Sequence, residues 1–314
     1  MRFSVIVPLY NKASYIKKAL DSVMEQTFKD YELIVVDDGS TDNSLCIAQD
    51  ALEKTGLNFQ LIHQENAGVS TARNNGVAVS HGDFLCFLDA DDWWAPTFLE
   101  RIDWLIREYP DAGIYGTNYY YVKNNKKRVC VSSTETGYID YCRVYYEQFA
   151  MPLTSISVAI NRTVFNEFGG FRPTLKLGED FDLWIRIALK YKVAFLNEAL
   201  AFYFQDSDPE WRGIRQMQEP KYHMLWNLDY LIEEEKSNTD YRRLIDRLRT
   251  YSLLPYYLTK KYRKAAKAEL NKVDWSRQSK KTRILYSLPI PILKCRMALL
   301  KVGSRIKQTL VKHL

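Results

Sequence analysis

The sequence predicts an α/β fold: a doubly wound mixed sheet followed by a mainly helical, basic C-terminal region. In residues 1–90, β-branched runs alternate with amphipathic segments at helical spacing, a pattern typical of parallel βαβ units. Charge is also unevenly distributed along the chain. Residues 1–205 contain 20 Lys and Arg and 26 Asp and Glu, whereas residues 241–314 contain 20 Lys and Arg and only 3 Asp and Glu. We therefore predict two parts of one α/β domain, residues 1–109 and 110–205, and a helical region, residues 206–314.

The expected elements alternate regularly before residue 110 and are mixed after it. The first part contains expected strands at 3–7, 32–36, 59–62 and 83–88 and helices at 14–26, 44–54, 69–79 and 96–109. The second part contains expected strands at 112–115, 119–122, 128–131, 154–160, 193–196 and 200–204, a short helix from Arg162 and a helix over 180–190. From Asp206 onward the pattern is mainly helical.

Composition narrows the class of protein. At 314 residues the chain can bury a large core, and its 46% hydrophobic and 26% charged content is ordinary for a globular protein. The N-terminal apolar run meets Pro8 too early for a signal peptide, and no run approaches the roughly 18 apolar residues of a membrane-spanning helix. Five scattered cysteines without a CxxC spacing indicate reduced thiols. These features predict a cytoplasmic protein.

The segment from Phe84 to Trp93 joins an apolar strand to three carboxylates, Asp89, Asp91 and Asp92. Strand interiors rarely carry acids, and adjacent carboxylates repel one another unless a cation lies between them. Open α/β sheets bind ligands at the carboxyl ends of their strands, and Mg²⁺ takes one or two carboxylates together with phosphate oxygens. The segment therefore indicates a metal-dependent site for a phosphate-bearing substrate, or else an acidic turn in which Asp91 or Asp92 caps the next helix.

Four segments are expected to meet at one edge of the sheet, because each follows a strand: residues 8–11, 37–40, 66–74 and 89–91. Tyr10 can stack on a base, Asp38 can accept a hydrogen bond from a base imide or a ribose hydroxyl, and Arg73 offers a positive fork. Taken singly, residues 37–40 also fit a plain turn with a helix cap, and Arg73 also fits a solvated helix residue. Their convergence favours a site for a nucleotide diphosphate.

Residues 178–184, Gly-Glu-Asp-Phe-Asp-Leu-Trp, place acids at the start of a helix. One interpretation is electrostatic, because the helix dipole favours acids there. The other is catalytic: Asp180 as a general base, with Trp184 on the same helical face. A carboxylate beside an indole suits a sugar, so Glu179 and Trp184 are expected acceptor-side residues. Trp93 and Trp94 are expected to line the same cleft, with core packing the alternative for these two.

Residues 5–11, 35–42, 66–74, 89–92 and 178–180 together resemble, in the same order, the family 2 inverting glycosyltransferases of the GT-A fold. The resemblance covers about residues 1–205. It implies transfer of a sugar from a nucleotide sugar, commonly a UDP-sugar, to a hydroxyl acceptor, with inversion at the anomeric carbon. By resemblance, the nucleotide contacts are Pro8, Tyr10, Asn11, Asp38, Arg73 and Asp89, the ligands of Mg²⁺ or Mn²⁺ are Asp91 and Asp89, and the catalytic base is Asp180.

The chain departs from the family after its last expected strand. Many relatives carry a Tyr-Arg-x-His-like segment there, whereas residues 202–208 read Phe-Tyr-Phe-Gln-Asp-Ser-Asp, and Arg212 or Arg215 is the expected replacement for the missing diphosphate contact. Two rival functions remain: a non-catalytic module that binds nucleotide sugars, and a sugar nucleotidyltransferase. The second normally has a Gly-rich basic loop near the first strand, where this chain has Pro8-Leu-Tyr-Asn11.

The basic C-terminal region predicts a partner at a membrane. A helix from about Pro291 places Ile292, Leu299, Ile306 and Leu310 within one arc, roughly opposite several Lys and Arg residues. We expect residues 284–314 to bind an anionic surface, at the inner face of a membrane, or else to pack on the acidic α/β domain. A lipid-linked or glycan acceptor in surface polysaccharide or glycan assembly fits that location by family analogy. Nucleic acid is not an expected partner, because no recognised motif accompanies the charge.

Overall fold

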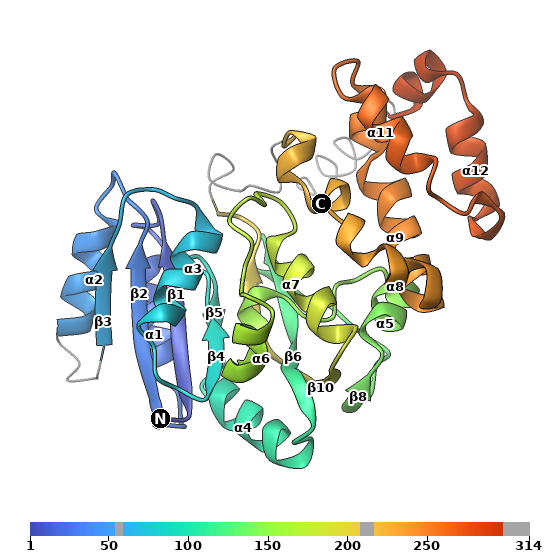
Figure 1. Cartoon of the computed structure of the whole chain (residues 1–314). Helices are drawn as coiled ribbons and strands as arrows, with labels where there is room; N and C mark the ends of the chain where they lie inside the picture. The colour runs from blue at the N-terminus through green and yellow to red at the C-terminus, as the bar shows by residue number, and fades with distance from the viewer. Residues whose placement is uncertain (54–58, 208–216, 298–314) are drawn as a thin grey trace, which may run out of the picture. The chain divides into compact units, whose positions relative to one another are not determined.

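The computed structural model describes residues 1–53, 59–207 and 217–297, and the chain divides into two compact units, residues 1–230 and 231–314. The first unit contains one mixed sheet with helices around it, as predicted from the sequence (Figure 1). Its backbone strand order is β3-β2-β1-β4-β9-β6-β10-β5, with β7 paired to β6 and β8 to β10. The strands are β1 (Phe3–Leu9), β2 (Tyr31–Asp37), β3 (Phe59–His63), β4 (Phe84–Phe87), β5 (Trp93–Trp94), β6 (Ala112–Lys123), β7 (Lys126–Val129), β8 (Gly137–Ile139), β9 (Val158–Asn161) and β10 (Lys192–Phe204).

Helices of the first unit cover both faces of the parallel strands. The helices are α1 (Ile16–Met24), α2 (Ser44–Glu53), α3 (Val69–Ala78), α4 (Phe98–Glu108), α5 (Tyr141–Gln148), α6 (Arg162–Glu167) and α7 (Glu179–Ala188). The chain moves outward from β1 through β2 to β3 and then returns to β4, so right-handed crossovers place α3 opposite α1 and α2. Gly76 lets α3 approach the sheet closely, since a Cβ there would lie 2.6 Å from Ile6 Cγ2.

A crevice is expected where the strand order reverses, between β1 and β4. Strand β1 pairs with β2 up to Leu9 and Asp37, but with β4 only up to Ile6 and Phe87. Pro8 lies in the stretch beyond that last pair, where it has no N–H to donate. Strand β1 therefore continues past the end of β4 without a partner on that side, and the segments after Leu9, Asp37 and Phe87 surround the same opening.

The second half of the sheet is longer and more continuous than the sequence pattern indicates. The strands expected at 112–115 and 119–122 are one strand, β6, and those at 193–196 and 200–204 are one strand, β10. Register shifts between Leu196 and Ala201 show why β10 reads as two runs, because the irregularity breaks the alternation of side chains. The short strands β5 and β8 and the helix α5 have too little periodicity to have been predicted.

The second unit is helical, with α8 (Ile232–Ser237), α9 (Thr239–Ser252), α10 (Leu254–Leu258), α11 (Arg263–Leu270) and α12 (Lys280–Ser287). Its core contains a buried cation, Arg249, which donates to Glu235 and lies 3.4 Å from Glu269. Residues 290–297 are also helical, whereas Leu299, Ile306 and Leu310 of the expected membrane-binding arc lie outside the described residues. Within the described part of the chain, no helix combines the length and the apolar character needed to cross a membrane.

Candidate active site

The loops after β1 and β2 are joined by Asn11, which follows the first strand with a left-handed φ of 50°. Its backbone N–H donates to Ser40 Oγ at 3.1 Å, and its Oδ1 accepts from the Thr41 backbone N–H at 2.8 Å. Asparagine tolerates the left-handed region better than most residues do, which fits its place at this turn. Asn11 is nearly buried and holds the crevice wall together, and its predicted contact with a nucleotide remains a prediction.

Asp38 ties the loop after β2 to the start of α3. Its two carboxylate oxygens accept hydrogen bonds from Ala67 N (2.8 Å), Gly68 N (2.9 Å) and Gln64 Nε2 (2.7 Å). The positive end of a helix and its free N–H groups favour a carboxylate at this place. The side chain is only 4% exposed, so Asp38 shapes the crevice as well as being a candidate base or ribose contact. Tyr10, half-buried beside it, is placed directly after β1.

Arg73 connects the nucleotide side of the crevice to the expected catalytic helix. It projects from α3, is 2% exposed, and donates to Asp89 Oδ1 at 2.7 Å, Glu179 Oε1 at 3.3 Å and Ser155 Oγ at 3.2 Å. The interpretation of Arg73 as a solvated helix residue is therefore wrong. Burial acts to lower the pKa of its guanidinium, but the charges of Asp89 and Glu179 outweigh burial and the pKa is raised. The guanidinium group of Arg73, which was expected to bind phosphate, forms hydrogen bonds with carboxylates instead.

The start of α7 is held by contacts that the sequence patterns do not show. Asn74 Nδ2 donates to the Phe171 carbonyl at 2.7 Å, and the Phe171 N–H returns a bond to Asn74 Oδ1 at 3.1 Å. Asp182, completely buried in the first turn of α7, accepts from Arg172 at 3.0 Å, Arg186 at 3.0 Å and Tyr230 OH at 2.6 Å. These bonds fix the position of the helix whose first residues are Glu179 and Asp180.

Asp180 is half-buried at the N-terminus of α7, where Gly178 has a φ of 83°. Its Oδ1 accepts from the Phe181 N–H at 2.7 Å, so the electrostatic role of an acid in the first helical turn is also met. Burial and then the charge of Glu179 raise the pKa of Asp180 to about 7, with Arg73 opposing them. A carboxyl group with a pKa near neutrality is suited to general base catalysis. The catalytic assignment itself remains a prediction.

The three acids after β4 have separate partners. Asp89 pairs with Arg73, and Asp91 Oδ2 accepts from Lys12 Nζ at 2.8 Å. Asp92, 2% exposed, accepts from the Phe204 N–H at 2.6 Å. The helix-cap interpretation is not supported, because α4 begins after Thr97 and has no side-chain cap. Lys12 is a site residue that the sequence reasoning missed, although its position next to Asn11 was a visible signal.

The fit of these acids to a metal depends on what the substrate supplies. Across the residues that the structure describes, no group of three or more His, Cys, Asp and Glu side chains is arranged to hold a metal ion. Asp91, 15% exposed in its side chain, offers hard oxygens of the kind that Mg²⁺ and Mn²⁺ prefer. One or two carboxylates suffice for Mg²⁺ where phosphate oxygens complete the shell. Arg212 and Arg215, the expected diphosphate contacts, lie outside the described residues.

Of three side chains expected on the acceptor side, one is half-exposed and two are engaged in contacts within the protein. Trp184 is completely buried and packs on Phe171 with ring centroids 5.9 Å apart, so its assignment to the acceptor is wrong. It lies one helical turn beyond Asp180, where the same face of α7 already enters the core. Glu179 turns to Arg73, whereas Trp93 is half-exposed on β5. Tyr145 of α5, missed from the sequence, lies near Asp180: burial and then the charge of Asp180 raise its pKa.

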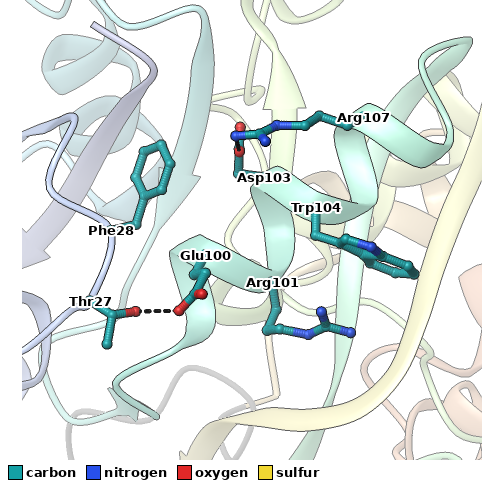
Figure 2. Close-up of a pocket in the computed structure, with 7 residues that line it drawn as sticks. All are labelled: Thr27, Phe28, Glu100, Arg101, Asp103, Trp104 and Arg107. Atoms are coloured by element: carbon teal, nitrogen blue, oxygen red, sulfur yellow. Dashed lines mark hydrogen bonds and ion pairs between the residues drawn. The ribbon is translucent and has the colours of Figure 1, made fainter.

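A cavity of about 450 Å³ lies elsewhere, lined by Thr27, Phe28, Glu100, Arg101, Asp103, Trp104 and Arg107 (Figure 2). Thr27 and Phe28 precede β2, so this cavity is at the amino ends of the strands, away from Asp38 and Asp89. Its charged groups are engaged: Arg107 with Asp103, Arg101 with Glu198, and Glu100 with Thr27. The cavity therefore belongs to the packing of α4 and carries none of the predicted site residues.

Sequence relatives include glycosyltransferase GlyA of Streptococcus pneumoniae serotype 4, which is 43% identical over 119 residues, 38% of this chain and 17% of that protein. An uncharacterized glycosyltransferase, alr2836 of Nostoc sp., is 36% identical over 211 residues, 65% of this chain and 64% of that protein. The chain thus spans between 17% and 64% of the length of these two relatives.

Solved structures with the same fold include Staphylococcus aureus TarS residues 1–349 in complex with UDP-GlcNAc, at 22% identity and a TM-score of 0.70, covering 83% of this chain and 76% of that one. Mannosyltransferase PcManGT from Pyrobaculum calidifontis, in complex with GDP-Man and Mn²⁺, has 19% identity and a TM-score of 0.52, covering 88% of each chain. These likenesses confirm the predicted GT-A fold. The model of the family described as glycosyl transferase family 2 matches residues 4–173. The predicted resemblance is thereby confirmed: this chain belongs to glycosyl transferase family 2.

Proposed function

We propose that the chain transfers a sugar from a nucleotide sugar, a UDP-sugar, to a hydroxyl group of an acceptor, with inversion at the anomeric carbon. One observation carries this proposal: Asp180, whose pKa is raised to about 7, starts a helix that Arg73 links directly to the carboxylate after β4. A base and a nucleotide-side acid are thereby held against the same crevice. Family membership and the binding of nucleotide sugars by the two structural neighbours support the same reaction class.

In the proposed mechanism, Asp180 accepts the proton of the acceptor hydroxyl. The hydroxyl oxygen forms a bond to the anomeric carbon as the bond from that carbon to the diphosphate oxygen breaks, and the diphosphate leaves with the electron pair. A single displacement of this kind inverts the anomeric configuration and needs no covalent intermediate with the protein. A positioned general base contributes about 10²–10⁴-fold in rate. Burial of Asp180 favours proton transfer because its carboxylate is a stronger base than an exposed one.

Asp91, with Asp89, would hold Mg²⁺ or Mn²⁺ together with the diphosphate of the donor. A bound divalent ion supplies compensation for the negative charge that develops on the leaving diphosphate, worth several kcal/mol. Lys12 lies 2.8 Å from Asp91 and is the protein's own cation at that place. It keeps the carboxylate oriented in the free protein, and its Nζ can move to a phosphate oxygen once the donor is bound.

A release assay tests the metal and the reaction together. Purified protein with a set of UDP-sugars and Mn²⁺ should release UDP, and NMR of the glycosylated product should show the opposite anomeric configuration. We expect EDTA in excess, and separately Asp91→Ala, to remove nearly all of the activity, because the leaving charge then lacks its counter-ion. Asp111→Ala, at an exposed carboxylate far along the chain, is the matched control and should leave the rate unchanged.

Each alternative interpretation predicts a different result in that assay. Full activity in excess EDTA would contradict a requirement for a metal ion and would indicate that Lys12 supplies the positive charge instead. Tight binding of UDP-sugars with no UDP release under any condition would indicate a non-catalytic module. Formation of a nucleotide sugar from a nucleoside triphosphate and a sugar phosphate would indicate a nucleotidyltransferase. We propose surface polysaccharide or glycan assembly as the setting, by analogy with the family.

A further inference from the structure

Three aromatic rings from three strands form a stack on one face of the sheet. Trp93 and Phe202 have ring centroids 5.4 Å apart and an interplanar angle of 9°, and Phe202 and Tyr120 are 5.3 Å apart at 19°. The stack follows from register, because Phe202 of β10 is paired with Trp93 of β5 on one side and with Tyr120 of β6 on the other. All three side chains are half-exposed. Apolar surface left open in this way is typical of ligand-binding grooves.

Two exposed lysines flank the stack. Lys18 Nζ of α1 lies 2.8 Å from the centroid of the Trp93 ring, and Lys127 Nζ of β7 lies 4.7 Å from that of Phe202. Burial and then the charge of Lys127 lower the pKa of Lys18, and the charge of Asp92 opposes them. Neither lysine forms an ion pair with any carboxylate in the described part of the chain. Their positive charge is therefore available to a ligand.

The turn beside Lys127 adds to this positive charge. The β6–β7 hairpin contains Lys123, Lys126, Lys127 and Arg128, all exposed and, within the described ranges, without a carboxylate partner. Arg128 lies over the ring of Tyr121 at 5.2 Å, so basic and aromatic side chains alternate here as they do on the stack. One acid lies at the same turn, where Asp206 Oδ2 accepts a hydrogen bond from the Asn124 N–H at 2.5 Å. Four cationic side chains beside a single carboxylate still attract an anion and raise its local concentration.

This surface is continuous with the crevice. Strands β4, β6 and β10 run in the same direction, so the ends of β6 and β10 lie at the edge where Asp89 and Asp91 follow β4. Phe204, the last residue of β10, is bonded to Asp92 and contacts the ring of Tyr15 at 5.8 Å. Strand β6 pairs with β9 only as far as Gly116, so its residues from Tyr119 to Lys123 extend beyond that pairing.

We propose that Lys18, Trp93, Tyr120, Lys127 and Phe202 form an acceptor-binding surface for an anionic glycan. Its phosphate or carboxylate groups contact the two lysines, and the apolar C–H groups of its sugar rings pack against the aromatic stack. The proposal rests on the proposed function, since it names the acceptor class of the same transfer reaction. A chain of sugars is favoured over a lipid surface because the stack lies beside the donor crevice, where an acceptor hydroxyl must arrive.

A direct binding experiment tests this surface without the donor. A fluorescently labelled sulfated dextran oligosaccharide and an unsulfated one of equal length are titrated with the full chain, and anisotropy is followed at low and moderate salt. We expect the sulfated probe to bind and the double variant Lys18→Gln/Lys127→Gln to bind it at least about tenfold more weakly. Lys29→Gln/Lys192→Gln, which removes two exposed lysines at the amino ends of strands, is the matched control and should bind like the wild type.

Further arms separate the possible ligands. Trp93→Leu should weaken binding of the sulfated oligosaccharide more than binding of inorganic polyphosphate, because only the first presents sugar rings. Equal binding of both probes, unaffected by Trp93→Leu, would overturn the assignment to a glycan. If the lysine variant instead lost binding to phosphatidylglycerol vesicles but kept binding to the glycan, the surface would be one that binds lipid. If the two lysine pairs behave alike in an active enzyme, this inference is wrong and the proposed function stands. An inactive protein that binds the sulfated probe through Lys18 and Lys127 would contradict the proposed function alone.

Discussion

The crevice and the acceptor-binding surface beside it use their polar groups in opposite ways. At the crevice, Asn11, Asp38 and Arg73 form hydrogen bonds with neighbouring loops and are almost completely buried. On the acceptor-binding surface, Lys18 and Lys127 are exposed and have no carboxylate partner among the described residues. The first region is thus organised before any ligand arrives, which favours catalysis because little rearrangement is required. In the second region the charged groups are exposed, and we expect them to determine which acceptor binds.

This difference separates two kinds of substitution. A change at the crevice alters the rate of the reaction, because it disturbs groups that hold one another in place. We expect a change on the proposed acceptor-binding surface to alter the affinity for an acceptor and to leave donor binding as it was. The experiments below test that division, beginning with the largest expected effect.

Asp180→Asn should nearly abolish transfer while donor affinity stays within a few-fold. The amide keeps the size of the side chain and its place on α7 but cannot accept the proton, so kcat should fall at least about 100-fold. Steady-state kinetics and calorimetric titration with the UDP-sugar measure the two quantities. Asp140→Asn, at the exposed start of α5, is the control and should retain full activity. More than about a tenth of the wild-type kcat in the Asp180 variant would show that another group is the base.

Asp182→Asn should lower both stability and kcat. Removing this buried charge leaves Arg172 and Arg186 without their shared carboxylate, which costs about 3 kcal/mol in the free energy of unfolding. The first turn of α7 then loosens, and kcat falls without a change in donor affinity. Urea unfolding and kinetics measure both effects. Asp103→Asn, at another buried acid that is paired with Arg2 and Arg107, should lose stability but keep its kcat. Equal kcat in the two variants would contradict a positioning role for Asp182.

The pH dependence should report the environment of Asp180. The group must be ionised to accept a proton, so kcat/KM should rise with pH, with its acidic limb near the raised pKa of about 7. The charge of Arg73 lowers that pKa, so Arg73→Gln should move the limb to higher pH, whereas Arg73→Lys should move it less. Rate measurements between about pH 5 and 9 decide. A wild-type profile that stays flat down to about pH 5, as for an exposed Asp, would contradict the raised pKa of Asp180.

Sequence patterns predicted correctly that the loops after β1, β2 and β4 and the start of α3 come together, because these loops restrict residue types at fixed spacing. Asp38 accepts from the Gly68 N–H, and the φ of 89° at that residue favours Gly, so a carboxylate after β2 occurs together with a Gly before α3. The acceptor-binding surface has no such signature: its five residues come from α1, β5, β6, β7 and β10. Strand register brings four of them together, and Lys18 of α1 joins them over the ring of Trp93. Trp184 shows the reverse error. Its helical phase with Asp180 was correct, but burial depends on what covers the helix, which periodicity does not reveal.

The smallest effect on catalysis is expected from the C-terminal residues 284–314, which hold six Lys and Arg and no Asp or Glu. Among the described residues of this segment, Ile284 and Ile292 are more than half exposed, whereas Leu293 is completely buried.

Deletion of residues 284–314 should leave kcat with a water-soluble acceptor unchanged but abolish co-sedimentation with phosphatidylglycerol vesicles. Each basic residue near an anionic leaflet contributes about 1 kcal/mol, so binding should weaken with salt and be absent with neutral lipid. A second variant replaces the six basic residues by Gln and keeps the apolar residues. If charge dominates, this variant should also lose binding to the vesicles. Equal partitioning of the full-length and truncated proteins would contradict membrane binding. A lower unfolding midpoint in the truncated protein would then assign the segment to packing within the fold, and acceptor selection would rest on the aromatic and basic surface alone.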